Sequence, residues 1–522
     1  MNPVQNRSIS ASAGTGKTFR LAHRYIGLMA AGVAPDRICA LTFSRKAAGE
    51  IFDKIVEHLC AAVTDDKKRG QTAATIEKEG FVPPDEANDY LRLLRTLLDH
   101  GHRLRIGTLD SFILGVVRAF PLELGVPPET QPMDNDGGEA AAARLSILTR
   151  LFDPRSSREE SRQEAFLSDF RMSQHGRETK KLLSVLDQLV KDYHVFYRTH
   201  GAQTWHWGDP DRIWPRADRW WEPGPDDAPP PDTLAESLRA MFGETGRPGQ
   251  LGKNLSDVTD AALSHAIDKP WPQRNDKASR LILENVKNHR PPTLSYYGKE
   301  YVLPQPLWDG VRFALRHAID VEIGRALTQT QGLRTVLGRY DECYAAAQTH
   351  DGHFTFEDLS RLLGSGGPSP SRVPDAENRL YIDYRLDGRL DHWLMDEFQD
   401  TSDTQWGTLA NLVDEVIQDD ARSFFFVGDI KQSIYGWRGG NHRLFGDVAR
   451  DCGIPRGEPL VACHRSLPAV IQAVNAVFDR LPDWVPAAGA AKGPHADAVT
   501  AFSDEWQPHV SARLGEGEGF AA

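Results

Sequence analysis

The stretch Ser8-Ile9-Ser10-Ala11-Ser12-Ala13-Gly14-Thr15-Gly16-Lys17-Thr18 decides the fold class of this chain. It has the small residues and the Gly-Lys-Thr ending of a phosphate-binding loop, with Ala11 where the common pattern has its first glycine. Small residues let backbone N–H groups surround a phosphate, Lys17 reaches the terminal phosphates, and Thr18 offers a hydroxyl to Mg²⁺. The alternative is a Gly/Ser-rich turn that binds nothing. The position of the stretch between a strand-like and a helical segment favours the phosphate-binding loop.

Composition indicates an ordinary globular protein. The chain has 522 residues, of which 40% are hydrophobic and 26% charged, and a chain of this length is expected to form about two to four domains. The net charge of −12 gives no general basic field for nucleic acid, although an acidic protein can carry a locally positive groove. The five cysteines lack the spacing of a metal site and indicate reduced thiols. With no long apolar run and no signal peptide, we expect a cytoplasmic protein without a membrane partner.

Strand-like and helical segments alternate after the loop. Apolar residues recur at helical spacing over 19–31, and the apolar run Arg37–Phe43 is typical of a buried parallel strand. Ser44 suits the N-cap of the next helix. A further strand is expected over Arg105–Phe112, followed by a helix to Phe120. This order is the opening of a doubly wound α/β nucleotide-binding domain.

The next stretch, up to about the mid-340s, has a different character, and we expect it to be a mostly helical insertion. Helices are predicted over 140–152, 180–195, 234–242, 278–288 and 308–347. Between them lies a tryptophan-dense segment with Trp205, Trp207, Trp214, Trp220 and Trp221. Exposed indoles beside arginines could stack on bases. We favour the simpler interpretation, in which the rings attach an irregular loop to the surface of the domain.

The α/β pattern resumes after this insertion. The strand-like run Asp391–Met395 leads into Asp396-Glu397, and the apolar run Ser423–Val427 leads into Gly428-Asp429. Hydrolysis of an Mg²⁺–nucleotide needs such a carboxylate pair, because one carboxylate holds the metal and its neighbour orients and deprotonates the attacking water. An Asp-Glu pair alone is common on solvated helices. After an apolar strand it predicts a site, since the carboxyl ends of parallel strands meet at one edge.

These stretches together resemble the superfamily 1A DNA helicases, the UvrD/Rep/PcrA group. Within that group, the sequences at 12–18 and 107–112 are most similar to the RecB/AddA branch. The resemblance implies a P-loop, RecA-like parallel sheet with a mostly helical inserted subdomain and the start of a second RecA-like domain. The stretches that carry it are Ala11–Thr18, Leu41–Ile51, Gly107–Phe112, Leu394–Ser402, Val427–Asn441 and Leu460–Phe478.

The resemblance also implies domain boundaries and a nucleotide site. Residues 1–125 and 346–445 would form the ATP-binding domain, 126–345 the inserted subdomain, and 446–522 the start of the second domain with an Ala/Gly/Pro-rich tail. ATP would be held by residues 11–18, with Gln5 reading the adenine. His464 stands where the family usually places a ring that stacks on adenine, and an imidazole stacks less strongly.

The residues for hydrolysis follow from the same resemblance. Thr18 and Asp396 would hold Mg²⁺, and Glu397 would act on the hydrolytic water. Lys17 would serve the phosphates, Gln432 would sense the γ-phosphate and Arg465 would supply a cation to the transition state. The catalytic set is therefore Lys17, Glu397, Gln432 and Arg465.

On the DNA side, the rings of Phe43, Tyr435 and Trp437 match positions that stack on single-stranded bases, with Thr42 and Arg438 near the backbone. Stacking suits a motor because every base has a π-face, so that grip does not depend on sequence. The γ-phosphate sensor and two base-stacking rings share one short run. This run would connect the state of ATP to the grip on DNA.

The resemblance predicts an ATP-dependent DNA helicase or translocase, of 3′→5′ direction, in repair, recombination or defence. The later helicase motifs and a nuclease domain have no match in the chain. We therefore expect a polypeptide that supplies the rest of the second domain, and weak hydrolysis without unwinding by this chain alone. The alternative is a nucleotide-dependent DNA-binding or assembly subunit without motor activity.

Overall fold

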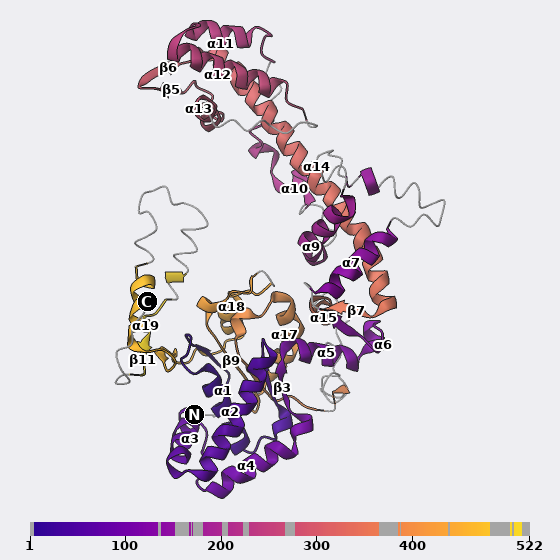
Figure 1. The fold of residues 1–522 in the computed structure, drawn as a ribbon, viewed down its shortest axis with the longest axis vertical. Helices are drawn as coiled ribbons and strands as arrows, with labels where there is room; N and C mark the ends of the chain where they lie inside the picture. The colour runs from indigo at the N-terminus through magenta and orange to yellow at the C-terminus, as the bar shows by residue number, and fades with distance from the viewer. Residues whose placement is uncertain are drawn as a thin grey trace. The chain divides into compact units, whose positions relative to one another are not determined.

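The structure is a computed structural model that describes residues 5–133, 137–151, 166–168, 170, 181–200, 207–222, 229–266, 277–364, 385–386, 388–436, 439–480, 502–503 and 506–513. The chain divides into two compact units (Figure 1). Unit 1 consists of Met1–Gly137 and Gln348–Ala522, and unit 2 is Gly138–Ala347. Trp205, Trp437, Arg438 and most of the Ala/Gly/Pro-rich tail lie outside the described residues.

Unit 1 contains a five-stranded sheet in the order β1-β9-β8-β2-β3, and every neighbouring pair is parallel. The two strands β8 and β9 follow unit 2 in the sequence, yet they lie between β1 and β2. The parallel α/β sheet predicted from the sequence is therefore confirmed, and it is built from both sides of the insertion. The strands are β1 (Arg7–Ser10), β2 (Ile38–Thr42), β3 (Arg105–Thr108), β8 (His392–Met395) and β9 (Ser423–Gly428).

Helices cover both faces of this sheet, which explains why its central strands are apolar along their whole length. In β9, Phe424 and Phe426 enter one hydrophobic core, whereas Phe425 and Val427 enter the other. The first core also takes residues from α5 (Leu109–Ala119), α15 (Phe356–Leu363), α17 (Asp403–Ile417) and α18 (Leu444–Asp451). The second takes residues from α1 (Lys17–Ala30), α2 (Arg45–Thr64), α3 (Asp66–Lys78) and α4 (Ala87–Asp99).

Two helix starts test the local predictions. The Ser44 hydroxyl accepts a hydrogen bond from the backbone N–H of Ala47 at 3.2 Å, so the predicted N-cap is confirmed. The strand expected to reach Phe112 ends at Thr108 instead, and α5 begins at Leu109. The physical reason is a capping box, in which Thr108 and Ser111 exchange side chain–backbone hydrogen bonds of 3.1 Å.

Unit 2 is mostly helical and has hydrophobic cores of its own. The predicted helices correspond to α7, α9, α11, α13 and α14, whereas α12 and a hairpin of β5 and β6 were not predicted. Gly252 lets α12 pack closely, because a Cβ there would lie 2.8 Å from the Cβ of Phe242. The elements are α7 (Gly138–Arg150), α9 (Leu182–His200), α10 (Pro210–Ile213), α11 (Leu234–Phe242), α12 (Gly246–Leu263), α13 (Lys277–Asn285), β5 (Thr293–Tyr296), β6 (Lys299–Val302) and α14 (Gln305–Asp351).

The described tryptophans of unit 2 pack inward. Trp207 is 2% exposed in a core with Val336 and Leu337, and Trp221 is 6% exposed with Trp214 edge-on at 5.2 Å. The Lys287 ammonium lies 4.8 Å from the ring centre of Trp220. These rings serve packing, as the simpler interpretation of the segment predicted, and among the described residues of the segment they present no stacking surface of exposed indoles.

Smaller elements complete unit 1. Two short parallel pairs lie outside the main sheet, and α19 stands between the strands of the second pair in the sequence. Among the described residues, no helix is long and apolar enough to cross a membrane. The elements are α6 (Pro121–Leu124), β4 (Gln131–Met133) with β7 (His353–Thr355), and β10 (Ala462–Cys463) with β11 (Val510–Ser511), together with α19 (Pro468–Phe478).

The buried histidine at the start of β8 makes the stability of unit 1 depend on pH. His392 is 2% exposed, and its Nδ1 lies 3.0 Å from the hydroxyl of Ser423. Burial, with smaller contributions from nearby arginines, lowers the pKa of His392 from 6.5 to about 4. The folded state therefore binds fewer protons than the unfolded state below pH ~6.5, and the free energy of unfolding falls as the pH falls from about 6.5 to 4.

We expect His392→Gln to remove part of this acid sensitivity, by up to about 3 kcal/mol between pH 7 and pH 4. Urea unfolding followed by tryptophan fluorescence at several pH values measures the difference. His353→Gln is the control, because His353 is exposed on β7. Equal pH slopes for the two variants would contradict the assignment.

Candidate active site

The site lies at the carboxyl edge of the main sheet, where its parallel strands end together. The loop from Ala11 follows β1, Phe43 follows β2, and Asp396-Glu397 follows β8, while Asp429 follows β9. All of these residues belong to unit 1, although they lie on both sides of unit 2 in the sequence. Residues far apart along the chain therefore come together at one edge.

The phosphate-binding loop has the backbone that its sequence predicts. Gly14 and Gly16 have φ values of 72° and 92°, a region that glycine adopts readily. The Thr15 hydroxyl donates to the Ser12 carbonyl at 2.7 Å. Ala11 is fully buried, and its N–H donates to the carbonyl of Gly428 at 2.9 Å. The methyl group of Ala11 thus fills the core at the position where the common pattern has glycine.

The side chains predicted for phosphate, metal and water lie side by side. Lys17 Nζ donates to Glu397 Oε2 at 2.7 Å, and Thr18 Oγ1 donates to Asp396 Oδ2 at 3.3 Å. Asp396 is 5% exposed. A hydroxyl and a carboxylate at the end of a phosphate loop are hard oxygen ligands, so these residues fit an Mg²⁺ ion that arrives with a nucleotide.

The electrostatics of the site support this fit. Burial, followed by the negative charge of Glu397, raises the pKa of Asp396 to about 6. The same two causes raise the pKa of Asp400 to about 6. Lys17 is the cation that partly offsets these carboxylates. The cluster therefore has more negative than positive groups, and a divalent cation would reduce its electrostatic cost.

Glu397 is held in an unusual backbone conformation. Its φ of 54° and ψ of 41° lie in the left-handed region, which residues other than glycine seldom adopt. Such strain persists only where surrounding contacts determine it, and it is typical of functional sites. Here Lys17 and Gln399 both donate to Glu397 Oε2, at 2.7 and 2.8 Å.

The segment after β9 places Gln432 beside Asp429. Asp429 is 2% exposed, and its Oδ2 accepts a hydrogen bond of 2.5 Å from Gln432 Nε2. Its Oδ1 forms an ion pair of 2.9 Å with Lys431 Nζ. The sequence singled out Gln432, whereas Asp429, Gln399 and Asp400 stood within the motifs without a role. Only the buried contacts reveal their part in the site.

Residues 455–465 lie along the phosphate loop on the other side of β1. The backbone N–H of His464 donates to the Gly14 carbonyl at 2.8 Å, and Ser12 N–H donates to the Leu460 carbonyl at 3.2 Å. A Cβ on Gly14 would lie 2.8 Å from the Cβ of Arg465. Both His464 and Arg465 are exposed. The structure therefore brings both residues to the loop.

Gln5 is not brought to the phosphate loop. It precedes β1, so it lies at the opposite end of that strand from the loop. Its carbonyl accepts a hydrogen bond of 2.6 Å from Arg24, which lies about two turns along α1. Among the described residues, the side chains that bond at the loop are those of Thr15, Lys17 and Thr18 with the carboxylates after β8.

The described residues of the predicted DNA side lie at the ends of β2 and β9. The rings of Phe43 and Tyr435 are 4.5 Å apart at an angle of 30°. Thr42 is only 2% exposed, so its side chain does not face solvent. Trp437 and Arg438 lie outside the described residues.

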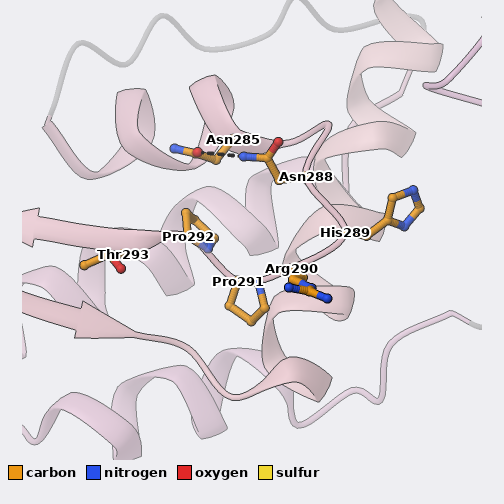
Figure 2. A pocket seen from close by; sticks show the side chains of 7 residues that line it. All are labelled: Asn285, Asn288, His289, Arg290, Pro291, Pro292 and Thr293. Atoms are coloured by element: carbon orange, nitrogen blue, oxygen red, sulfur yellow. Dashed lines mark hydrogen bonds between the residues drawn. The ribbon is translucent and has the colours of Figure 1, made fainter.

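A separate cavity of about 530 Å³ lies in unit 2 (Figure 2). It is lined by Asn285, Asn288, His289, Arg290, Pro291, Pro292 and Thr293. Asn288 donates to Asn285 at 2.9 Å beside it. None of the predicted site residues lines this cavity. In the part of the chain that the structure describes, no cluster of three His, Cys, Asp or Glu residues forms a further metal site.

Comparison with curated proteins gives relatives along most of the chain, each of them a subunit of an ATP-dependent helicase/nuclease. The chain is 24% identical over 511 residues to the one from Streptococcus equi subsp. zooepidemicus, and 25% identical over 512 residues to the one from Streptococcus uberis. These alignments cover 92% of the chain and 38% of each relative. The relative from Moorella thermoacetica is 25% identical, with 91% of the chain and 34% of the relative covered. The chain thus spans little more than a third of the length of these relatives.

Family comparison gives a match over more than half of the chain. Residues 2–206 and 328–453 match the UvrD/REP helicase N-terminal domain. The matched ranges include the phosphate loop, the carboxylate pair after β8 and the Asp429–Gln432 segment after β9. On this evidence of sequence and geometry, the chain belongs to the UvrD/REP helicase family and carries its N-terminal domain.

Proposed function

We propose that this chain is the ATP-binding and ATP-hydrolysing part of a DNA helicase or translocase. The observation that carries the proposal is the meeting of Lys17 and Thr18 with Glu397 and Asp396 at one sheet edge. The similarity to proteins named as subunits of ATP-dependent helicase/nucleases supports it. The finer features of the proposal are 3′→5′ movement on single-stranded DNA, a role in repair, recombination or defence, and a cytoplasmic location.

The geometry supports a division of labour in ATP hydrolysis. The loop N–H groups and Lys17 bind the phosphates, so Lys17 exchanges its contact with Glu397 for one with the nucleotide. Bound Mg²⁺, held by Thr18 and Asp396, would neutralise phosphate charge. Glu397 orients a water molecule and takes its proton while the water oxygen bonds to the γ-phosphorus and the bond to the β–γ bridging oxygen breaks. ADP and phosphate leave.

Two further residues act on the phosphate side. Gln432, which donates to Asp429, would turn its amide to the γ-phosphate. Arg465, beside Gly14, would supply positive charge to the transition state from outside the main sheet. His464 would lie near the base. The position of Gln5 argues against direct contact with a nucleotide in the loop, because Gln5 lies at the far end of β1.

For DNA, we propose that Phe43 and Tyr435 form a stacking surface for single-stranded bases, since their rings already lie together. Trp437 and Arg438 follow Tyr435 in the sequence and would extend this surface. Thr42 is buried, so any contact with the DNA backbone would not involve an exposed side chain.

The domain assignment is part of the proposal. Residues 1–125 and 346–445 would be the first RecA-like domain, and 126–345 the inserted subdomain. Residues 446–522 would begin the second RecA-like domain, and the parallel β10 and β11 on either side of α19 in sequence support this. Further helicase motifs would come from additional sequence, in the same polypeptide or in a partner.

The first prediction concerns the nucleotide. We expect Lys17→Ala to abolish binding of an Mg²⁺-bound fluorescent ATP analogue, because the phosphates lose their cation. Glu397→Gln should leave the Kd within about twofold and lower hydrolysis about 100-fold or more. Lys46→Ala is the control, because the Lys46 side chain is 87% exposed. Unchanged hydrolysis in Glu397→Gln would remove Glu397 from the proposed mechanism.

The second prediction concerns DNA. Phe43→Ala and Tyr435→Ala should each weaken binding of single-stranded DNA by about 10-fold, equally for mixed sequences, because base stacking is lost. Fluorescence anisotropy with labelled oligonucleotides measures the change. Tyr297→Ala, at a tyrosine that is 60% exposed on unit 2, is the control. The same affinity in all three variants would rule out the stacking surface.

DNA-stimulated hydrolysis is the test of the whole proposal. The assay compares the rate of ATP hydrolysis with and without single-stranded DNA, in an assembly that contains the remaining helicase motifs. Stimulation by DNA is the expected result. ATP binding without any effect of DNA on hydrolysis would instead support a DNA-binding or assembly subunit without motor activity.

A further inference from the structure

A single buried amide joins the two loops of the proposed site. Gln399, in the short helix η6 (Phe398–Asp400), is 1% exposed. Its Nε2 donates to Glu397 Oε2 at 2.8 Å and to Asp400 Oδ2 at 3.3 Å. Its Oε1 accepts the backbone N–H of Asp429 at 2.9 Å. One end of the amide therefore holds carboxylates after β8, and the other end holds the backbone after β9.

The surroundings leave this amide little freedom. A Cβ on Gly428 would lie 2.5 Å from Gln399 Oε1, so glycine makes the space that the amide occupies. The Ser433 hydroxyl donates to the Gln399 carbonyl at 3.3 Å. A buried polar group with this set of partners is costly to remove, and it defines the relative position of the segments that it joins.

The contact with Glu397 matters because that carboxylate has two donors. Lys17 and Gln399 both bond Glu397 Oε2. When Lys17 engages a phosphate, Gln399 is the described donor that continues to hold the carboxylate. The left-handed backbone of Glu397 allows this contact within the tight turn after β8. Gln399 can thus keep the carboxylate aimed at the hydrolytic water.

The other end of the amide reaches the γ-phosphate sensor. Asp429, bonded through its N–H to Gln399, accepts Gln432 Nε2 on its carboxylate. Tyr435, whose ring lies against Phe43, follows three residues later. A movement of Gln432 or Tyr435 would therefore be transmitted through Asp429 to Gln399 and Glu397.

We propose that Gln399 is a positioning residue that orients Glu397 and couples it to the 429–435 segment, so that DNA binding alters hydrolysis. This inference rests on the proposed function and deepens it. The competing explanation is that Gln399 only stabilises the fold.

Three variants separate these explanations. Gln399→Met keeps the length of the side chain and removes both hydrogen bonds. Gln399→Glu keeps an acceptor for the Asp429 N–H but replaces the donor to Glu397 with a like charge. Gly428→Ala leaves Gln399 in place and crowds its Oε1. Gln348→Met is the matched control, because Gln348 is a buried amide, 6% exposed, on α14.

The measurements use the full helicase that contains this chain. They are the Kd for Mg²⁺–ATP, single-turnover hydrolysis with and without single-stranded DNA, the Kd for DNA with and without nucleotide, and thermal unfolding. We expect Gln399→Met and Gln399→Glu to keep the nucleotide Kd within about twofold and to lower hydrolysis about 10- to 100-fold. The stimulation by DNA and the effect of nucleotide on DNA affinity should both fall toward a factor of one. Gly428→Ala should change them in the same direction.

The outcomes are distinguishable from those of the proposed function. If the unaltered protein binds no nucleotide or shows no stimulation by DNA, the proposed function fails and this inference falls with it. If the unaltered protein responds to DNA and Gln399→Met retains the same stimulation, only the inference is overturned. A loss in Gln399→Met that Gln348→Met shows to the same extent, at matched loss of thermal stability, would assign Gln399 a purely structural role.

Discussion

The contact between Lys17 and Glu397, at 2.7 Å, is the interaction on which the site depends. It joins the first residue of α1 to the turn after β8, across the whole of unit 2 in the sequence. The contact is possible because β8 and β1 are both parallel neighbours of β9, so their carboxyl ends lie at one edge. Register in this sheet is therefore the constraint that brings a phosphate-binding cation to a hydrolytic carboxylate.

The same arrangement gathers charges that would be unfavourable alone. Asp396 and Asp400 are buried beside Glu397, and the pKa of each is raised to about 6. The left-handed backbone of Glu397 adds strain. The hydrogen bonds from Lys17 and Gln399 offset part of this cost. Such a site is suited to a substrate that carries a divalent cation, because the cation stabilises the group of carboxylates most when it is bound.

The sequence by itself determined the fold class and the location of the site. The uninterrupted apolar run Phe424–Val427, the glycines of the phosphate loop and the Asp396-Glu397 pair each reflect local physics that a sequence displays. Sequence patterns were insufficient where close packing overrides local preference, as at Gly252 in α12, or where a capping box ends a strand, as at Thr108.

Only the tertiary structure decided which polar groups share the buried space. It separated Gln5 from the phosphate loop, buried Thr42, and placed His464 and Arg465 against Gly14. It also placed Gln399 between Glu397 and Asp429. Hydrogen-bond partners of a buried amide depend on strands that are distant in sequence, and no local periodicity encodes them.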